Sequence, residues 1–196
     1  MPLTLEPAAV MLKKETAARH IDVEKTMNPR IGNIRSVEDY ASVLKTFYGF
    51  YFPLQNKISR ILTDSDLADI SERKLASLVL EDLLSLGYPV TDIPICRDLP
   101  AISNKAEAFG CMYVMEGSTL GGRIISKWLQ SNTFISLQEE QLHFFSGYKE
   151  QTGAKWKTFL DALNEQQDVH AVIDAANATF TLFQNWITTT SNECSQ

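Results

Sequence analysis

Apolar residues recur at intervals of three and four along almost the whole chain, whereas the alternating runs typical of strands are nearly absent. This pattern predicts an all-helical protein with six or seven helices. The first helix is expected over residues 7–27, because Asn28-Pro29 should stop it. A second helix should begin after the cap Ser36 and continue toward Leu62, with Pro53 as a site for a kink.

The remaining helices are predicted from their apolar periods and their stop signals, and residues 91–100 are expected to form a loop. Gly87 and Pro89 should end the third helix, and Gly147 should end a short helix opened by a capping-box sequence at Ser136. The expected ranges are 65–86, 103–130, 136–147, 152–165 and 168–190. Without repeats or linkers, residues 1–196 should pack as a single helical-bundle domain.

Composition narrows the class of protein. The hydrophobic content of 44% is enough for one ordinary core, but the longest apolar stretch, residues 47–54, is far short of a membrane span of roughly 18 to 20 residues. The first residues lack a basic region followed by an apolar one, which predicts a cytoplasmic protein without a secretory signal. We therefore expect no membrane partner.

Charge and cysteine content exclude further classes. A net charge of −6 argues against a nucleic-acid partner, which would require a concentrated basic surface. Cys96, Cys111 and Cys194 are odd in number and widely spaced, without a C-x-x-C pair. We expect reduced thiols rather than a disulfide framework or a structural zinc site.

A first candidate for chemistry lies in the first predicted helix. Lys13, Thr16, His20 and Glu24 share one face, because residues three and four apart are neighbours on a helix. A neutral imidazole at His20 could ligate heme iron while Glu24 fixes the orientation of the ring. The alternative is an ordinary surface pair between His20 and Glu24. The other two histidines, His143 and His170, have less around them and are expected to be structural or exposed.

A second candidate is the run of glycines inside the fourth predicted helix. Gly117, Gly121 and Gly122 fall within six positions, and together they lower the local helix preference by roughly 3 kcal/mol relative to alanine. Bare backbone would allow a flat ligand to lie against the helix. Close helix–helix packing through small residues would explain the glycines equally well. A phosphate loop is excluded, because no G-K-[ST] ending and no preceding strand are present.

The two segments together resemble the heme oxygenase family. The resemblance rests on Leu12, Lys13, Thr16, His20 and Glu24, and on residues 113–122, which look closest to bacterial enzymes found with bacteriophytochromes. Residues 147–156 and 176–186 are also similar to that branch. The match thus extends over most of the chain, and its two central motifs are specific mainly in combination.

The resemblance implies roles for individual residues. His20 would be the proximal iron ligand oriented by Glu24, and Gly117, Gly121 and Gly122 would form the distal wall. Cations near the heme propionates would come from Lys13, Lys157 and Lys155. Ser118 stands where mammalian-type enzymes have an aspartate, so proton delivery would use water held by Ser118 and backbone groups, with a contribution from Arg123.

The function implied by the resemblance is oxidative opening of heme b, which is both substrate and cofactor, to biliverdin, Fe²⁺ and CO. It requires O₂ and an external electron donor such as a ferredoxin or a reductase, and the product could serve a bacteriophytochrome pathway. Ser118 keeps one alternative open, a non-catalytic heme carrier or sensor of the same fold. A purely structural helical interaction protein is a more distant alternative.

Overall fold

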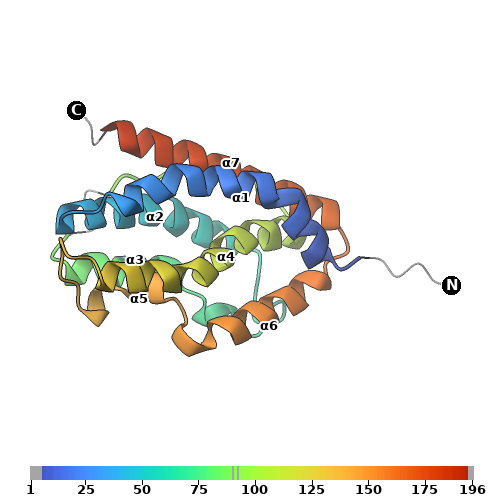
Figure 1. Cartoon of the computed structure of the whole chain (residues 1–196). Helices are drawn as coiled ribbons and strands as arrows, with labels where there is room; N and C mark the ends of the chain where they lie inside the picture. The colour runs from blue at the N-terminus through green and yellow to red at the C-terminus, as the bar shows by residue number, and fades with distance from the viewer. Residues whose placement is uncertain (1–5, 90, 92, 194–196) are drawn as a thin grey trace.

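The computed structural model describes residues 6–89, 91 and 93–193, and all regular elements within these ranges are helical (Figure 1). Seven α-helices are present in this part of the chain, together with short 3₁₀ turns. The α-helices are α1 (Ala8–Gly32), α2 (Val37–Ile58), α3 (Leu75–Ser85), α4 (Lys105–Gln130), α5 (His143–Ser146), α6 (Thr152–Asn164) and α7 (Val169–Glu193). The 3₁₀ turns are η1 (Ile70–Glu72), η3 (Glu139–Gln141) and η4 (Lys149–Gln151). The all-helical fold predicted from the sequence is confirmed.

Helices α1, α4 and α7 run in the same direction, and α7 packs against both of the others (Figure 1). Hydrogen bonds join α1 to α7 at two levels. The side chain of Asn177 donates to the carbonyl of Glu15 in the first halves of the helices, and Arg30 donates to the hydroxyl of Thr190 near their C-terminal ends. At Gly110, an added Cβ would overlap the backbone carbonyl of Val172, so α4 and α7 approach each other closely there. No described helix is both long enough and apolar enough to cross a bilayer.

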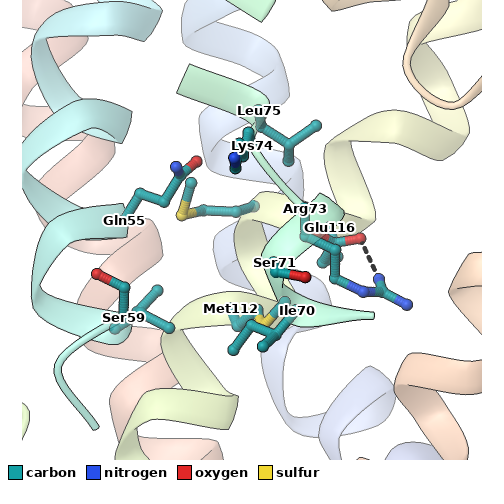
Figure 2. A pocket seen from close by; sticks show the side chains of 11 residues that line it. Gln55, Ser59, Ile70, Ser71, Arg73, Lys74, Leu75, Met112 and Glu116 are labelled. Atoms are coloured by element: carbon teal, nitrogen blue, oxygen red, sulfur yellow. Dashed lines mark hydrogen bonds and ion pairs between the residues drawn. The ribbon is translucent and has the colours of Figure 1, made fainter. Parts of the chain in front are cut away.

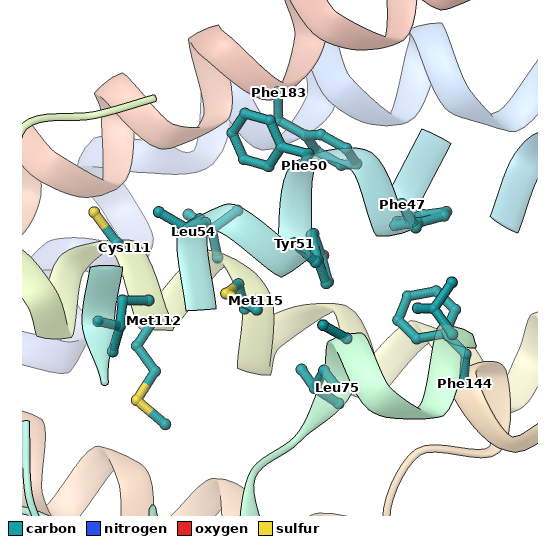
Figure 3. Packing of buried hydrophobic residues seen from close by; sticks show 14 of the residues in the cluster. Phe47, Phe50, Tyr51, Leu54, Leu75, Cys111, Met112, Met115, Phe144 and Phe183 are labelled. Carbon is teal, nitrogen blue, oxygen red and sulfur yellow. The ribbon is translucent and has the colours of Figure 1, made fainter. Parts of the chain in front are cut away.

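The core is built around the aromatic stretch of α2. Phe47, Phe50 and Tyr51 are buried and pack against Phe144 of α5 and Phe183 of α7 (Figure 3). The ring centroids of Phe47 and Phe144 lie 4.8 Å apart, and those of Phe50 and Phe183 lie 4.9 Å apart. This stretch therefore joins α2, α5 and α7 in one apolar cluster.

Several predicted boundaries are confirmed by their caps. The side chain of Ser36 accepts the N–H of Asp39, whose carboxylate accepts the N–H of Ser36, which is a capping box at the start of α2. Gly87 and Gly147 both have positive φ, as residues that end helices often do. Residues 93–100, the described part of the expected loop after residue 92, contain no helix.

The predicted end of the first helix is wrong, because α1 continues through Pro29 to Gly32. Proline lacks the N–H that would bond the preceding turn, so this last turn loses one backbone hydrogen bond. Tertiary contacts stabilise it instead. Met27 and Ile31 are buried, and the Arg30 guanidinium donates to the carbonyl of Ile187 and to the hydroxyl of Thr190 in α7.

The third predicted helix is also corrected. Only its second half is α-helical, since η1 precedes it and Arg73 and Lys74 have ψ angles of 71° and 56°, outside the helical region. Helix α2 accommodates Pro53 and ends at Ile58, before Leu62. The capping box expected at Ser136 lies instead at Gln138 and Gln141, at the start of η3. Cys194, expected to be a free thiol, lies outside the described residues, whereas Cys96 and Cys111 are free and buried.

Candidate active site

His20 lies on α1 with its imidazole half exposed, at 55% of the side-chain surface. Its Nδ1 is 3.6 Å from Oε2 of Glu24, one helical turn further on. The imidazole of His20 makes an edge-to-face contact with the ring of Phe180 in α7. The ring centroids lie 5.7 Å apart, and the angle between the ring planes is 84°. Two neighbours thus restrict the orientation of the imidazole, and Nε2 has no hydrogen-bond partner among the described residues. An available Nε2 is what an axial ligand to iron requires.

The opposite side of the candidate site is α4, where Tyr113 is close enough to Thr16 of α1 for that side chain to act on its pKa, in the lowering direction. Burial raises the pKa of Tyr113. Because α1 and α4 run in the same direction, one turn beyond this contact brings the chain to His20 on α1 and to Gly117 on α4. The two helices separate beyond that level (Figure 1).

Gly117 and Gly121 present bare backbone. A Cβ added at Gly121 would meet no atom within 4 Å, and one added at Gly117 would meet only Trp156 of α6, at 3.9 Å. Leu120 and Ile124 lie on the same exposed stripe of α4. The neighbouring helices therefore do not require glycine at positions 117 and 121, which favours the ligand-facing interpretation of these two residues.

Gly122 has a different role from the one expected, and its place in the distal wall is corrected. A Cβ at this position would lie 2.6 Å from the carbonyl oxygen of Phe145 and 3.3 Å from its carbonyl carbon. Gly122 is buried, so its missing side chain allows α5 to pack directly on α4. The packing interpretation thus holds for Gly122, whereas the ligand-facing interpretation stays a prediction for Gly117 and Gly121.

Ser118 is turned toward the core. Its hydroxyl donates to the carbonyl of Met115 at 2.6 Å, and its side chain is close enough to Tyr51 of α2 to lower the pKa of that phenol. Tyr51 is buried, and burial raises its pKa. Contact between Ser118 and a distal water stays a prediction, and the hydroxyl of Ser118 already donates to the Met115 carbonyl.

The candidate cations differ in their availability. Lys155 is buried in an ion cluster, where its Nζ lies 2.8 Å from Asp69 and 2.7 Å from Glu72, so its expected role near a propionate is corrected. Lys157 is exposed and pairs with Asp161 at 2.6 Å, one turn along α6. Lys13 and Arg123 are exposed, on α1 and α4 respectively. Lys13, Arg123 and Lys157 remain the candidates for contacts with an anionic ligand.

His143 has the structural role that was expected. Its Nδ1 lies 3.0 Å from Oδ1 of the buried Asp82, which also accepts the backbone N–H groups of His143 and Phe144. These bonds attach the start of α5 to α3. His170 is exposed, on the first turn of α7.

A cavity of about 150 Å³ lies on another face of α4, between α2 and the segment that leads from η1 into α3 (Figure 2). It is lined by Met112, Met115 and Glu116 of α4, and neither His20 nor Gly117 contributes to it. Drug-sized ligands usually occupy cavities of about 300 to 1,000 Å³. We therefore place the candidate active site between α1 and α4, and not in this cavity.

Three residues that border the site were not identified from the sequence. Tyr113 lies one turn before Gly117, Trp156 is the side chain that a Cβ at Gly117 would meet, and Phe180 contacts the ring of His20. The position of Tyr113 on the glycine face could have been deduced from its spacing. Trp156 and Phe180 approach through the packing of α6 and α7, which leaves no signal at fixed sequence distance.

The fold and the site define an all-helical protein in which a half-exposed histidine on one helix lies level with a partly buried glycine on another. The family model for heme oxygenase matches residues 90–189. The chain belongs to the heme oxygenase family, and it is an oxidoreductase of that class. The matched range includes Gly117 and Gly121, whereas His20 lies before it.

Individual proteins give the same result. A heme oxygenase of Xanthomonas campestris pv. campestris (strain 8004) is 28% identical over 153 residues, which cover 77% of this chain and 88% of that protein. The solved structure of the NO- and CO-bound heme oxygenase from Neisseria meningitidis superposes with a TM-score of 0.80 at 21% identity, over 95% of this chain and 92% of the other. The helical fold is therefore that of a heme oxygenase along nearly its whole length.

Proposed function

We propose that this enzyme binds heme b between α1 and α4 and opens it to biliverdin, Fe²⁺ and CO, with O₂ and an external electron donor. The family and the fold support the reaction class. The observation that carries the assignment of the site is the pairing of His20 on α1 with the bare backbone of Gly117 and Gly121 on α4. Heme supplies both a redox-active iron and the porphyrin that is opened.

On the proximal side, His20 would donate Nε2 to the iron, because Glu24 lies against Nδ1. Glu24 would then select the tautomer that has its proton on Nδ1, and Phe180 would restrict rotation of the ring. A neutral imidazole donates less electron density than a cysteine thiolate does. Such a ligand fits a reaction in which the porphyrin itself is oxidised.

On the distal side, the backbone of Gly117 and Gly121 would approach the porphyrin face closely, since neither residue carries a side chain. Leu120 and Ile124, whose side chains are exposed, would cover apolar parts of the macrocycle. Lys13, Arg123 and Lys157 would offer positive charge to the two propionates. The protons would come from water ordered by backbone groups of this helix, with Ser118 and Arg123 as the candidate side chains.

The electron donor in this proposal is an acidic protein such as a ferredoxin, or a reductase. It would be attracted by the positive charges of Lys13, Arg123 and Lys157. We place the enzyme in the cytoplasm, where thiols such as Cys96 and Cys111 stay reduced. The resemblance of residues 113–122 to bacteriophytochrome-associated enzymes suggests chromophore supply as the use of the product.

The test is an absorption time course of the purified protein loaded with one equivalent of hemin and supplied with ascorbate or a ferredoxin system in air. Loss of the Soret band with growth of a broad red band would support ring opening. A Soret band that persists would contradict catalytic ring opening and would support the alternative of a non-catalytic heme carrier. His20→Ala should lose the proximal ligand, whereas His170→Ala, an exposed histidine on α7, serves as the matched control.

A further inference from the structure

A buried ion cluster lies directly behind the glycine run of α4. Glu116, which precedes Gly117, is only 2% exposed, and its carboxylate accepts a hydrogen bond from Nη1 of Arg73 at 2.6 Å (Figure 2). It also accepts one from the hydroxyl of Tyr148 at 2.8 Å. The Arg73 side chain is completely buried. Burial raises the pKa of Glu116, although Arg73 acts on it in the opposite direction.

The cluster extends to three further groups. Nε and Nη2 of Arg73 donate to the two carboxylate oxygens of Asp69 at 2.8 and 3.0 Å, and Nη2 also donates to the carbonyl of Lys155 at 2.8 Å. Lys155 in turn pairs with Asp69 and Glu72. Glu116 thus attaches α4 to the η1–α3 junction through Arg73 and to the segment before η4 through Tyr148, and Arg73 carries the connection on to α6.

The location of these bonds along α4 is significant. Gly117 and Gly121 lie between Glu116, which is held by Arg73 and Tyr148, and Gly122, which packs on Phe145. Glycine has a weak helix preference, and neither Gly117 nor Gly121 has a side chain that could anchor it. The helix is therefore attached to the rest of the fold on both sides of its intrinsically weakest turn.

Stability alone is a poor explanation for the pair. A buried ion pair is often no more stabilising than well-packed apolar residues of the same volume, because both charges lose their hydration. Its hydrogen bonds, however, have fixed directions, and the planar guanidinium of Arg73 is held in a fork by Asp69. Such bonds define the rotation and depth of α4 more sharply than apolar contacts do.

We propose that Glu116 is a positioning residue: through Arg73 and Tyr148 it fixes the α4 backbone at Gly117 relative to His20. The inference rests on the proposed function, because the ligand between the two helices is taken to be heme. Glu116 itself faces away from that ligand, into the cluster, and acts only through the backbone of the glycine that follows it.

The first experiment uses the heme-free protein and is independent of heme binding. Amide hydrogen exchange of residues 117–122 is compared among the wild type, Glu116→Ala, Glu116→Gln and Leu83→Ala, a truncation in the buried part of α3. Arg73 keeps its bonds to Asp69 in Glu116→Ala, so the fold should survive. If Glu116→Ala does not fold, Tyr148→Phe, which removes one bond to Glu116, takes its place.

Loss of the charge-assisted bonds should accelerate exchange at residues 117–122 by about tenfold relative to other helices. Glu116→Gln, whose amide can still accept from Arg73, should restore most of the protection. Leu83→Ala should show no selective acceleration there. Equal acceleration of these amides in Glu116→Ala and Leu83→Ala would overturn the proposal.

The second experiment measures the C–O stretching band of the ferrous carbon monoxide complex. Glu116→Ala should broaden or split the band, because the distal backbone would adopt several positions, and Glu116→Gln should return it to one band. An unchanged single band in Glu116→Ala would contradict the positioning role. If wild-type protein fails to bind hemin through His20, the proposed function fails instead, and the exchange experiment still decides the role of Glu116.

Discussion

Gly122 and Phe145 are in contact so close that a methyl group on Gly122 would lie 2.6 Å from the Phe145 carbonyl oxygen. The adjacent Gly121 has no atom within 4 Å of the same hypothetical methyl group. Two consecutive glycines on one helix therefore serve different purposes. Gly121 leaves its backbone uncovered by other parts of the protein, and Gly122 allows α5 to pack on α4.

Alanine at these two positions should have opposite effects on stability. Gly121→Ala should raise the free energy of unfolding of the heme-free protein by about 0.5 to 1 kcal/mol, because alanine favours the helix and the methyl group meets nothing. Gly122→Ala should lower it by about 1 to 3 kcal/mol, because the contact with Phe145 is with backbone that cannot rotate away. Urea unfolding of the two variants measures both effects.

Heme titration of the same variants completes this test. Gly121→Ala should weaken heme binding by about tenfold or more, since its methyl group would stand between the backbone and the porphyrin. A variant that is more stable yet binds heme as tightly as the wild type would remove Gly121 from the distal wall. Gly153→Ala on α6, which also meets nothing within 4 Å, is the control for the effect of alanine alone.

Glu24→Ala tests the orientation of the proximal imidazole. The two side chains are both half exposed, so the loss of their contact should change the free energy of unfolding by less than about 0.5 kcal/mol. The affinity for hemin should nevertheless fall about tenfold, because an unsupported histidine is a poorer ligand. Hemin titration and the iron–histidine stretching frequency in resonance Raman spectra are the measurements.

Asp22→Ala is the matched control for Glu24→Ala. Asp22 also lies on α1 and contacts a side chain of its own helix, Lys25, at 3.9 Å. Its removal should change neither the hemin affinity nor the iron–histidine frequency. If both variants weaken binding equally, the charge of α1, and not the orientation of His20, governs the affinity.

Lys13 and Lys155 should separate heme binding from stability. Lys155→Ala leaves Asp69 and Glu72 without this partner and should reduce the free energy of unfolding by about 1 to 3 kcal/mol, with little change in the heme affinity of the folded protein. Lys13→Ala should leave stability within about 0.5 kcal/mol and weaken heme binding by about two- to fivefold. If Lys155→Ala instead weakened heme binding and left stability unchanged, Lys155 would be a heme-binding residue.

Salt provides an independent check on Lys13. An exposed pair between Lys13 and a propionate is screened at high ionic strength. The difference in heme affinity between wild type and Lys13→Ala should therefore shrink as salt is added. The loss in free energy of unfolding caused by Lys155→Ala should depend much less on salt, because Lys155 is buried. Unfolding and hemin titrations at low and high salt distinguish the two.

The helical fold could be predicted because its cause is local. Apolar spacing and caps such as Ser36 lie within a few residues of the structure that they determine. The break before α3 could not be predicted in this way, since the buried Arg73 pairs with Glu116, 43 residues away in the sequence. Pro29 remains helical for a similar reason, because Arg30 is bonded to α7.

The candidate site shows the same division. His20 and Glu24 are one turn apart, so their contact follows directly from the spacing. The difference between Gly121 and Gly122 depends on where α5 packs, and the loss of Lys155 from the cation set depends on Asp69 and Glu72 in another segment. Sequence spacing therefore predicts which helices carry the candidate site, but the tertiary structure determines which side chains are available to it.

Cys111 makes a prediction about alkaline stability. It is fully buried in α4, and burial raises the pKa of its thiol to about 11. In the unfolded chain a thiol has a pKa of about 8.5. Between these two values the unfolded state loses the proton first, so the folded state loses relative stability as pH rises, by up to about 1.4 kcal/mol per pH unit.

Cys111→Ser removes this titration while keeping a hydroxyl near Thr179, the present partner of the thiol. Urea unfolding at pH 8 and pH 10 should show a smaller decrease in the free energy of unfolding for Cys111→Ser than for wild type. The buried tyrosines, whose pKa values are also raised, titrate in both proteins and cancel in the difference. Equal decreases in the two proteins would mean that the Cys111 thiol ionises alike in the folded and unfolded states.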